Sequence, residues 1–195
     1  MFSISSLGPI DANYRAVKRG FPFALLLASS ILPLQCATLE RLSLDDMISK
    51  STAIVRGKVG GSYAAFSGPV IYTHYTIQVS ERFKGANADS VEVVVPGGVA
   101  NNLRQSFAGA PVLNPGDEYV FFLYTGKNGL TTVVGLTQGL FSLAADPSGD
   151  PTATRNASRE LMLDRSSGRP VKDETLVMRL SDLRARVAAG LKGGK

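Results

Sequence analysis

The stretch Val70-Ile-Tyr-Thr-His-Tyr-Thr-Ile-Gln-Val79 decides the fold class, because its side chains alternate between two kinds. A period of two places successive side chains on opposite faces of a β-strand. One face carries the more apolar set and is expected to meet the core: Ile71, Thr73, Tyr75, Ile77 and Val79. The other face carries Tyr72, His74, Thr76 and Gln78 and is expected to point outward.

Similar β-branched and aromatic runs surround this strand, each bounded by Gly, Pro, Asn or Asp. They cover residues 53–59, 91–95, 119–124, 131–134 and 140–143. Short strands punctuated in this way are typical of a small all-β barrel or sandwich. Gly60-Gly61 predicts a β-bulge where a long first strand bends, and the run 119–124, apolar on both faces, predicts the central strand.

Two helices are expected to flank the strands. Ser43 followed by Asp46 is a capping-box pattern, and Leu44, Met47 and Ile48 share one helical face. Near the C-terminus, Ser181 is expected to cap a final helix. The apolar stripe of that helix would be Leu183, Val187, Ala188 and Leu191.

The remaining segments are predicted to be connections. Residues 97–118 form a long connection, closed by the turn sequence Asn114-Pro-Gly-Asp117, and a connection of that length is more often functional than plain linker. Residues 152–155 are expected to return as an edge strand. The polar, Arg- and Ser-rich segment 157–174 is expected to be loose.

The N-terminus has the composition of a secretory signal peptide. Arg15, Lys18 and Arg19 precede an apolar run over residues 21–34, and Cys36-Ala37 follows. We expect residues 1–37 to be a signal peptide cleaved near Ala37, which predicts a periplasmic or extracellular protein. A buried helix or an N-terminal anchor is the alternative. Lipidation of Cys36, the one cysteine, is another, and membrane contact is expected only in that case.

Charge is unevenly distributed along the chain. Residues 38–154 contain 8 Lys and Arg against 10 Asp and Glu, whereas residues 155–195 contain 10 against 5. Because acidic residues are interleaved in the basic segment, a solvated mixed-charge surface is favoured over a nucleic-acid site. No stable binding of nucleic acid is therefore expected.

Catalytic and metal-binding patterns are missing from the sequence. One His and one Cys cannot supply a zinc site, and no Gly-x-Ser-x-Gly elbow presents a nucleophile. Asp45-Asp46 is explained by helix capping and Asp117-Glu118 by a turn. His74, Glu81 and Glu92 are explained by outward strand positions. We therefore expect no enzyme, no catalytic residue, no metal and no cofactor.

Two motifs carry a resemblance to known proteins. The turn Phe83-Lys-Gly85 and the sequence Pro115-Gly-Asp-Glu-Tyr119 before an apolar strand are similar to netrin-like domains and tissue inhibitors of metalloproteinases. The chain looks closer still to a group of exported bacterial proteins of unknown function with the same layout. The resemblance covers about residues 43–144 and implies an OB-like Greek-key barrel. Those inhibitors chelate zinc through an N-terminal cysteine and carry disulfides, and here Cys36 alone could play that part.

Together these patterns predict a signal peptide (1–37), an OB-like β-barrel domain (38–156) and a polar basic segment with a terminal helix (157–195). The expected function is an exported, monomeric, non-catalytic binding module for a protein or cell-envelope partner. An exported protease is one such partner, which would make the protein inhibitor-like. A nucleic-acid or polysaccharide-binding OB-fold and a carboxylate-dependent hydrolase are the alternatives. The candidate partner-binding residues are Tyr63, Phe66, Tyr72, Asn101, Arg104 and Phe107.

Overall fold

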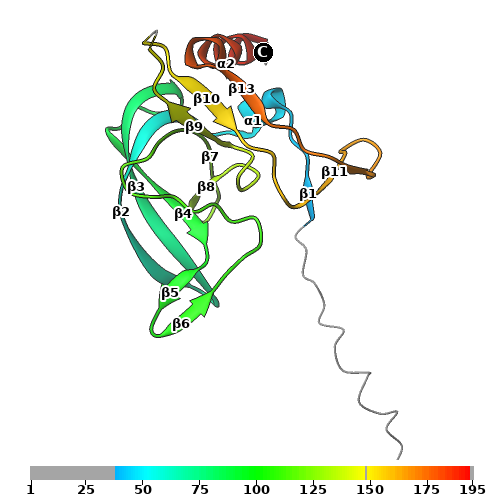
Figure 1. Ribbon diagram of the computed structural model, residues 1–195. Helices are drawn as coiled ribbons and strands as arrows, with labels where there is room; N and C mark the ends of the chain where they lie inside the picture. The colour runs from blue at the N-terminus through cyan, green and yellow to red at the C-terminus, as the bar shows by residue number, and fades with distance from the viewer. Residues whose placement is uncertain (1–37, 148, 194–195) are drawn as a thin grey trace, which may run out of the picture. The chain divides into compact units, whose positions relative to one another are not determined.

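A computed structural model describes residues 38–147 and 149–193 (Figure 1). Its main sheet is antiparallel throughout, in the order β13-β10-β9-β7-β2-β3-β4, and β8 pairs with the end of β7. The strands are β2 (Ala53–Ser67), β3 (Val70–Lys84), β4 (Ser90–Pro96), β7 (Glu118–Thr125), β8 (Thr131–Val133), β9 (Leu140–Ala144), β10 (Thr152–Arg155) and β13 (Leu176–Arg179). The expected all-β class with two helices is confirmed.

The sheet is strongly curved. The register of β2 on β3 shifts between Val59 and Ser62, which confirms the bulge predicted at Gly60-Gly61. The curvature brings β4 and β8 side by side. Within the described chain no backbone ladder joins these two strands, so the sheet does not close into a barrel.

Two apolar clusters pack against the faces of the sheet. One contains Val55, Ile77, Val93 and Phe121; the other contains Ile54, Phe122 and Phe141 together with residues of both helices. Residues 120–123 of β7 are completely buried and contribute to both clusters in alternation. The run 119–124 is therefore the central strand that the sequence predicts. The alternation of β3 is confirmed at Ile71, Tyr75 and Ile77, all buried.

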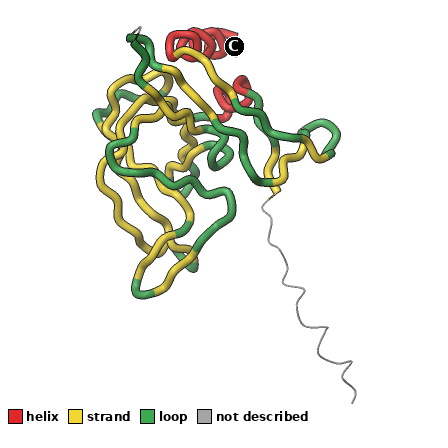
Figure 2. Tube along the Cα trace, viewed as in Figure 1, coloured by secondary structure: helices red, strands yellow, loops and turns green. Residues whose placement is uncertain are grey.

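The two helices lie against each other at one end of the sheet (Figure 2). In α1 (Leu44–Lys50) the capping box of Ser43 and Asp46 is formed, and Leu44, Met47 and Ile48 are buried, as expected. The expectation that Ser181 caps α2 (Leu180–Gly193) is wrong, because strand β13 runs directly into this helix. Asp150 instead accepts hydrogen bonds from the Ser181 amide (3.2 Å) and hydroxyl (2.7 Å).

The apolar stripe of α2 also differs from the prediction. Leu183 and Val187 are buried as expected, and Leu180 joins them. Ala188 and Leu191 are exposed. The face of α2 that packs against α1 continues through Gly190 instead, where an added Cβ would lie 3.1 Å from Ile48.

The segment 157–174 is built into the fold, and the expectation that it is loose is wrong. β1 (Thr38–Glu40) pairs in parallel with β11 (Leu161–Leu163), and β12 (Pro170–Val171) pairs with β11. Arg155 and Asp173 form a buried ion pair of 2.7 Å that holds the segment to β10. Nor is β10 an edge strand, because β13 pairs with its outer side.

The predicted signal peptide and Cys36 lie outside the described residues. Among the residues that are described, none belongs to a helix long and apolar enough to cross a membrane.

Candidate functional site

The long connection after β4 begins with a tight hairpin. β5 (Gly98–Ala100) pairs with β6 (Leu103–Gln105) across the two residues Asn101 and Asn102. Their φ angles are 49° and 61°, the left-handed values that a type I′ hairpin turn requires. Asparagine tolerates this region better than other residues with a side chain, which explains the Asn-Asn pair. The structure therefore places the predicted site residue Asn101 at the tip of a hairpin.

Side-chain hydrogen bonds hold this hairpin against the end of the β2–β3 ribbon. The Gln105 Oε1 accepts from the Ile71 amide (2.7 Å), and its Nε2 donates to the Pro69 carbonyl (2.9 Å). The Thr73 hydroxyl donates to the Gly97 carbonyl (2.7 Å). A Cβ on Gly98 would lie 2.6 Å from the Thr73 Oγ1, so only glycine allows the backbone to approach this closely.

We name this unit the apolar arm: residues 62–75 of the ribbon and residues 97–112 of the connection. Figure 1 shows β5 and β6 beside the end of the ribbon that is farthest from the helices. The arm exposes several large apolar side chains: Phe66 (40%), Val99 (53%), Leu103 (60%), Phe107 (43%) and Val112 (78%). Isolated exposed apolar residues are common, but five on one small unit form a candidate interaction surface.

The predicted site residues divide between the two faces of the ribbon. Phe66 lies opposite Ile71 in the ladder and shares the face that the β5–β6 hairpin covers. Phe107 follows β6, and Arg104 is exposed on β6 opposite Val99. The structure thus brings Phe66, Asn101, Arg104 and Phe107 to the hairpin side of the arm, whereas Tyr63 and Tyr72 occupy the other face of its ribbon.

On that other face, Tyr63 covers His74. The two rings stack with centroids 4.6 Å apart, and the His74 side chain is 13% accessible, so it is less exposed than its outward position suggests. Glu92 joins both rings: its Oε2 accepts from the Tyr63 hydroxyl (3.1 Å), and its Oε1 is 2.9 Å from the His74 Nδ1. The bond from His74 is the main cause that lowers the pKa of Glu92, and the bond to Glu92 raises the pKa of Tyr63.

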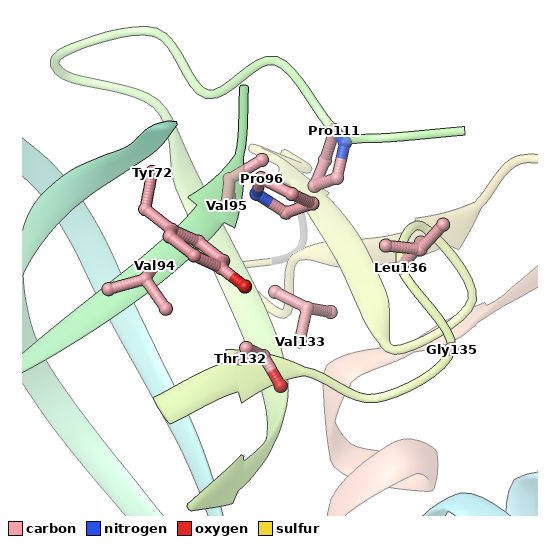
Figure 3. Close-up of a pocket in the computed structure, with 9 residues that line it drawn as sticks. All are labelled: Tyr72, Val94, Val95, Pro96, Pro111, Thr132, Val133, Gly135 and Leu136. Carbon is pink, nitrogen blue, oxygen red and sulfur yellow. The ribbon is translucent and has the colours of Figure 1, made fainter. Parts of the chain in front are cut away.

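Tyr72 lies at the seam between β4 and β8. It lines a largely apolar pocket of about 300 Å³ with Val94 and Pro96 on one side and Thr132, Val133 and Leu136 on the other (Figure 3). In Figure 3 the Tyr72 hydroxyl points toward the β8 side of this pocket. Tyr72 therefore lines an apolar hollow on the face of the ribbon opposite to the β5–β6 hairpin.

The second half of the connection is anchored in the core. Leu113 is 3% exposed and belongs to the cluster of Val93 and Phe121, and Ala110 packs against the same cluster. The segment is thus a fixed cover over one end of the curved sheet. Val99, Leu103 and Val112 are missing from the candidate partner-binding residues predicted from the sequence. They could have been found, because they are apolar residues isolated in a segment predicted to be a connection.

The carboxylates that could have formed a catalytic pair are each engaged separately. Glu118 receives two hydrogen bonds from Arg56 (2.8 and 3.1 Å), and Glu81 receives two from Arg184 (2.7 and 3.0 Å). Asp117 accepts from the Tyr119 hydroxyl, and burial together with this bond raises the pKa of Tyr119 to about 12.

No group of three or more His, Cys, Asp or Glu residues within the described ranges is placed to hold a metal ion.

Comparisons with protein-family models, with curated proteins and with solved structures give no match for this chain.

Proposed function

We propose that this protein is an exported, non-catalytic binding module whose apolar arm docks into an apolar groove of a protein partner. The observation that carries the proposal is the arm itself. It exposes five large apolar side chains, two of them (Val99 and Leu103) on the β5–β6 hairpin, whose backbone is held by Gln105, Thr73 and the close contact at Gly98. A surface that is held rigid before binding loses less conformational entropy when a partner docks.

The charge of the arm favours a protein over a nucleic acid. Residues 62–75 and 97–112 contain one residue of fixed charge, Arg104, and His74 as the only other titratable base. Nucleic-acid binding depends on neutralising phosphates with several Lys or Arg side chains. An apolar surface with one arginine is instead typical of the centre of a protein–protein interface.

The strand order supports an OB-like architecture within the all-β fold. β4, β3, β2, β7 and β8 follow one another as antiparallel neighbours, so β4 and β8 run in the same direction where they lie side by side. OB-folds are partly open five-stranded barrels. Within this proposal the Phe83-Lys-Gly85 turn ends β3 and the Pro115–Tyr119 motif leads into β7, as the resemblance to netrin-like domains implies.

The proposed partner class includes an exported protease, which would make the module inhibitor-like. Export rests on the composition of residues 1–37. Glu81, Glu92 and Glu118 each pair with a different basic side chain (Arg184, His74 and Arg56), which supports a role without catalysis.

Affinity capture from the envelope fraction of the native host, followed by mass spectrometry, tests the proposal. The bait is used as wild type, as Val99→Ser/Leu103→Ser, and as the control Val177→Ser, which alters an equally exposed valine on β13. We expect one stoichiometric partner that the wild type and V177S retain and that V99S/L103S loses.

A partner that all three baits retain equally would contradict the arm as the binding surface. Capture of nucleic acid that falls steeply with salt would support the alternative nucleic-acid role.

A further inference from the structure

A second pocket, which shares no residue with the apolar arm, carries four arginines. It has a volume of about 440 Å³ and is bordered by α1, β10, β13, α2 and the turn between β11 and β12. We name it the arginine pocket after Arg41, Arg155, Arg165 and Arg186, which all line it. Nothing in the proposed function uses this pocket, and the inference below does not rest on that function.

Arg155 is the buried member of the set. Its side chain is 2% accessible and lies on the same side of β10 as the buried Ala153. The Nη2 donates to the Asp173 Oδ1 (2.7 Å) and to the Glu174 carbonyl (2.6 Å). The Nε and Nη1 atoms have no hydrogen-bond acceptor among the described residues. Buried N–H groups are nearly always paired in native proteins, so these donors call for an acceptor that the described residues do not supply.

Of the other three arginines, Arg165 and Arg186 are exposed and Arg41 is half-buried, and all three are held more loosely. Arg41 lies 3.7 Å from Glu174, Arg186 lies 3.5 Å from Asp45, and Arg165 lies 3.3 Å from Glu40 and 3.2 Å from Asp46. Long ion pairs between exposed groups are weak, so Arg41 and Arg186 can turn toward a ligand at little cost.

The acidic groups around the pocket limit the charge of that ligand. Five carboxylates already form ion pairs with the arginines: Glu40, Asp45, Asp46, Asp173 and Glu174. A sixth, Asp164, lines the pocket and accepts hydrogen bonds from the Ser166 and Ser167 hydroxyls. These bonds lower the pKa of Asp164 to about 2, so it is anionic near neutral pH. The lining itself holds four arginines against two of these carboxylates, Asp46 and Asp164, so its formal charge favours a single carboxylate over a polyanion.

Apart from Ser43, the rest of the lining is apolar. Leu42, Leu44, Leu176 and Met178 contribute to the same pocket. A ligand that fits both parts has one anionic group and an aliphatic body.

From these observations we infer that the arginine pocket binds a monocarboxylate with an aliphatic body. Its carboxylate accepts hydrogen bonds from Arg155 and the exposed arginines, and its aliphatic part lies on the leucine side. Such a group is offered by a free N-acylated amino acid or by the C-terminal residue of a peptide, and both present the same chemistry.

The first test follows the Arg155 Nε–H resonance of the ¹⁵N-labelled wild-type protein by NMR. N-acetyl-leucine is expected to shift this resonance saturably, whereas N-acetyl-leucinamide, which lacks the carboxylate, is expected to leave it unchanged. The Arg56 Nε–H, bonded to Glu118 and not part of the pocket, is the internal control. A resonance that neither compound shifts, or that both shift equally, would overturn the inference.

A second test uses variants that keep the buried pair intact. Arg41→Ala and Arg186→Ala are each expected to weaken binding of N-acetyl-leucine about 2- to 5-fold, whereas Arg104→Ala on the apolar arm is expected to have no effect. Unchanged affinity in R41A and R186A would contradict the site.

To separate the two sources, a tetrapeptide that ends in a leucine carboxylate is compared with its C-terminal amide. Tighter binding of the acid peptide than of N-acetyl-leucine would identify a peptide C-terminus as the occupant. Weaker binding would identify a free small acid.

Discussion

Strand β7 and the apolar arm are built from similar residues in opposite environments. Residues 120–123 of β7 are completely buried between the two core clusters, whereas Val99, Leu103 and Val112 on the arm are more than half exposed. The difference arises from position: β7 has neighbours on both edges and both faces, and among the described residues the hairpin has a neighbour on one side alone. Apolar residues therefore stabilise the fold in one region and remain available for a partner in the other.

The largest effect is expected from the buried side of this comparison. Phe122→Ala is predicted to reduce the free energy of unfolding by about 3–5 kcal/mol, because the substitution leaves a cavity against Phe141. Leu103→Ala on the arm is predicted to change it by about 0.5 kcal/mol or less. Urea unfolding followed by circular dichroism measures both. Similar losses in the two variants would contradict the division between core and arm.

The buried ion pair between Arg155 and Asp173 is predicted to contribute nearly as much to stability as Phe122. Asp173→Ala removes the partner of Arg155, whose charge is then buried and unpaired, so the free energy of unfolding should fall by about 3 kcal/mol. Asp182→Ala, at an exposed position in α2, is the matched control and should change it by about 0.5 kcal/mol or less. A small effect of D173A in the same urea experiment would show that segment 157–174 is not fastened by this pair.

A smaller loss of stability is expected where the β5–β6 hairpin packs on the β2–β3 ribbon. Gly98 has a φ of 138°, and an alanine Cβ there would meet Thr73. Gly98→Ala should therefore cost about 1–2 kcal/mol and increase hydrogen exchange in β5 and β6 while exchange in β7 stays unchanged. Gly116→Ala is a useful control, because its φ of 92° is also positive but no atom lies near the added Cβ. Equal exchange of the hairpin in wild type and G98A would show that this contact does not hold the arm.

The smallest effect concerns the cap of α1 and depends on pH. Hydrogen bonds from Ser43 lower the pKa of Asp46, so the carboxylate contributes stability above its unfolded pKa of about 4 and loses that contribution as pH falls through the lower folded value. Ser43→Ala should cost about 1 kcal/mol at pH 7. The difference between S43A and wild type should shrink in thermal unfolding at pH 2–3. A difference independent of pH would contradict the capping box as its cause.

Local patterns of the sequence were enough to predict much of the fold. Alternation in residues 70–79, the Gly60-Gly61 bulge and the Ser43–Asp46 box each involve neighbours a few residues apart, and all are confirmed. The features that could not be predicted join distant segments. Asp150 caps α2 in place of Ser181, and Arg155 with Asp173 draws a polar segment into the fold. Side-chain composition alone does not show such pairings, because they depend on the register of β10 with β13.

The candidate site was predictable in part for the same reason. Asn101, Arg104 and Phe107 lie on the arm because the hairpin is local, although residues 97–118 were predicted from the sequence as a connection and the turn at Asn101 and Asn102 was not predicted. Tyr63 and Phe66 lie three residues apart on β2 with no register shift between them, so strand alternation places them on opposite faces. Tyr72 pairs with Ala65 and therefore shares the face of Tyr63. The exposure of Val99 and Leu103 could not be predicted in this way, because it depends on which distant segments pack against the hairpin.

The most direct test of the central claim is site-specific photo-cross-linking in the native host. A photoreactive amino acid replaces Leu103 on the arm or, as the control, Val177 on β13, both about 60% exposed (60% and 61%). The account predicts one discrete cross-linked protein from position 103 and none of that mass from position 177. The absence of a discrete adduct at 103, or the same adduct at both positions, would contradict the arm as the partner-binding surface.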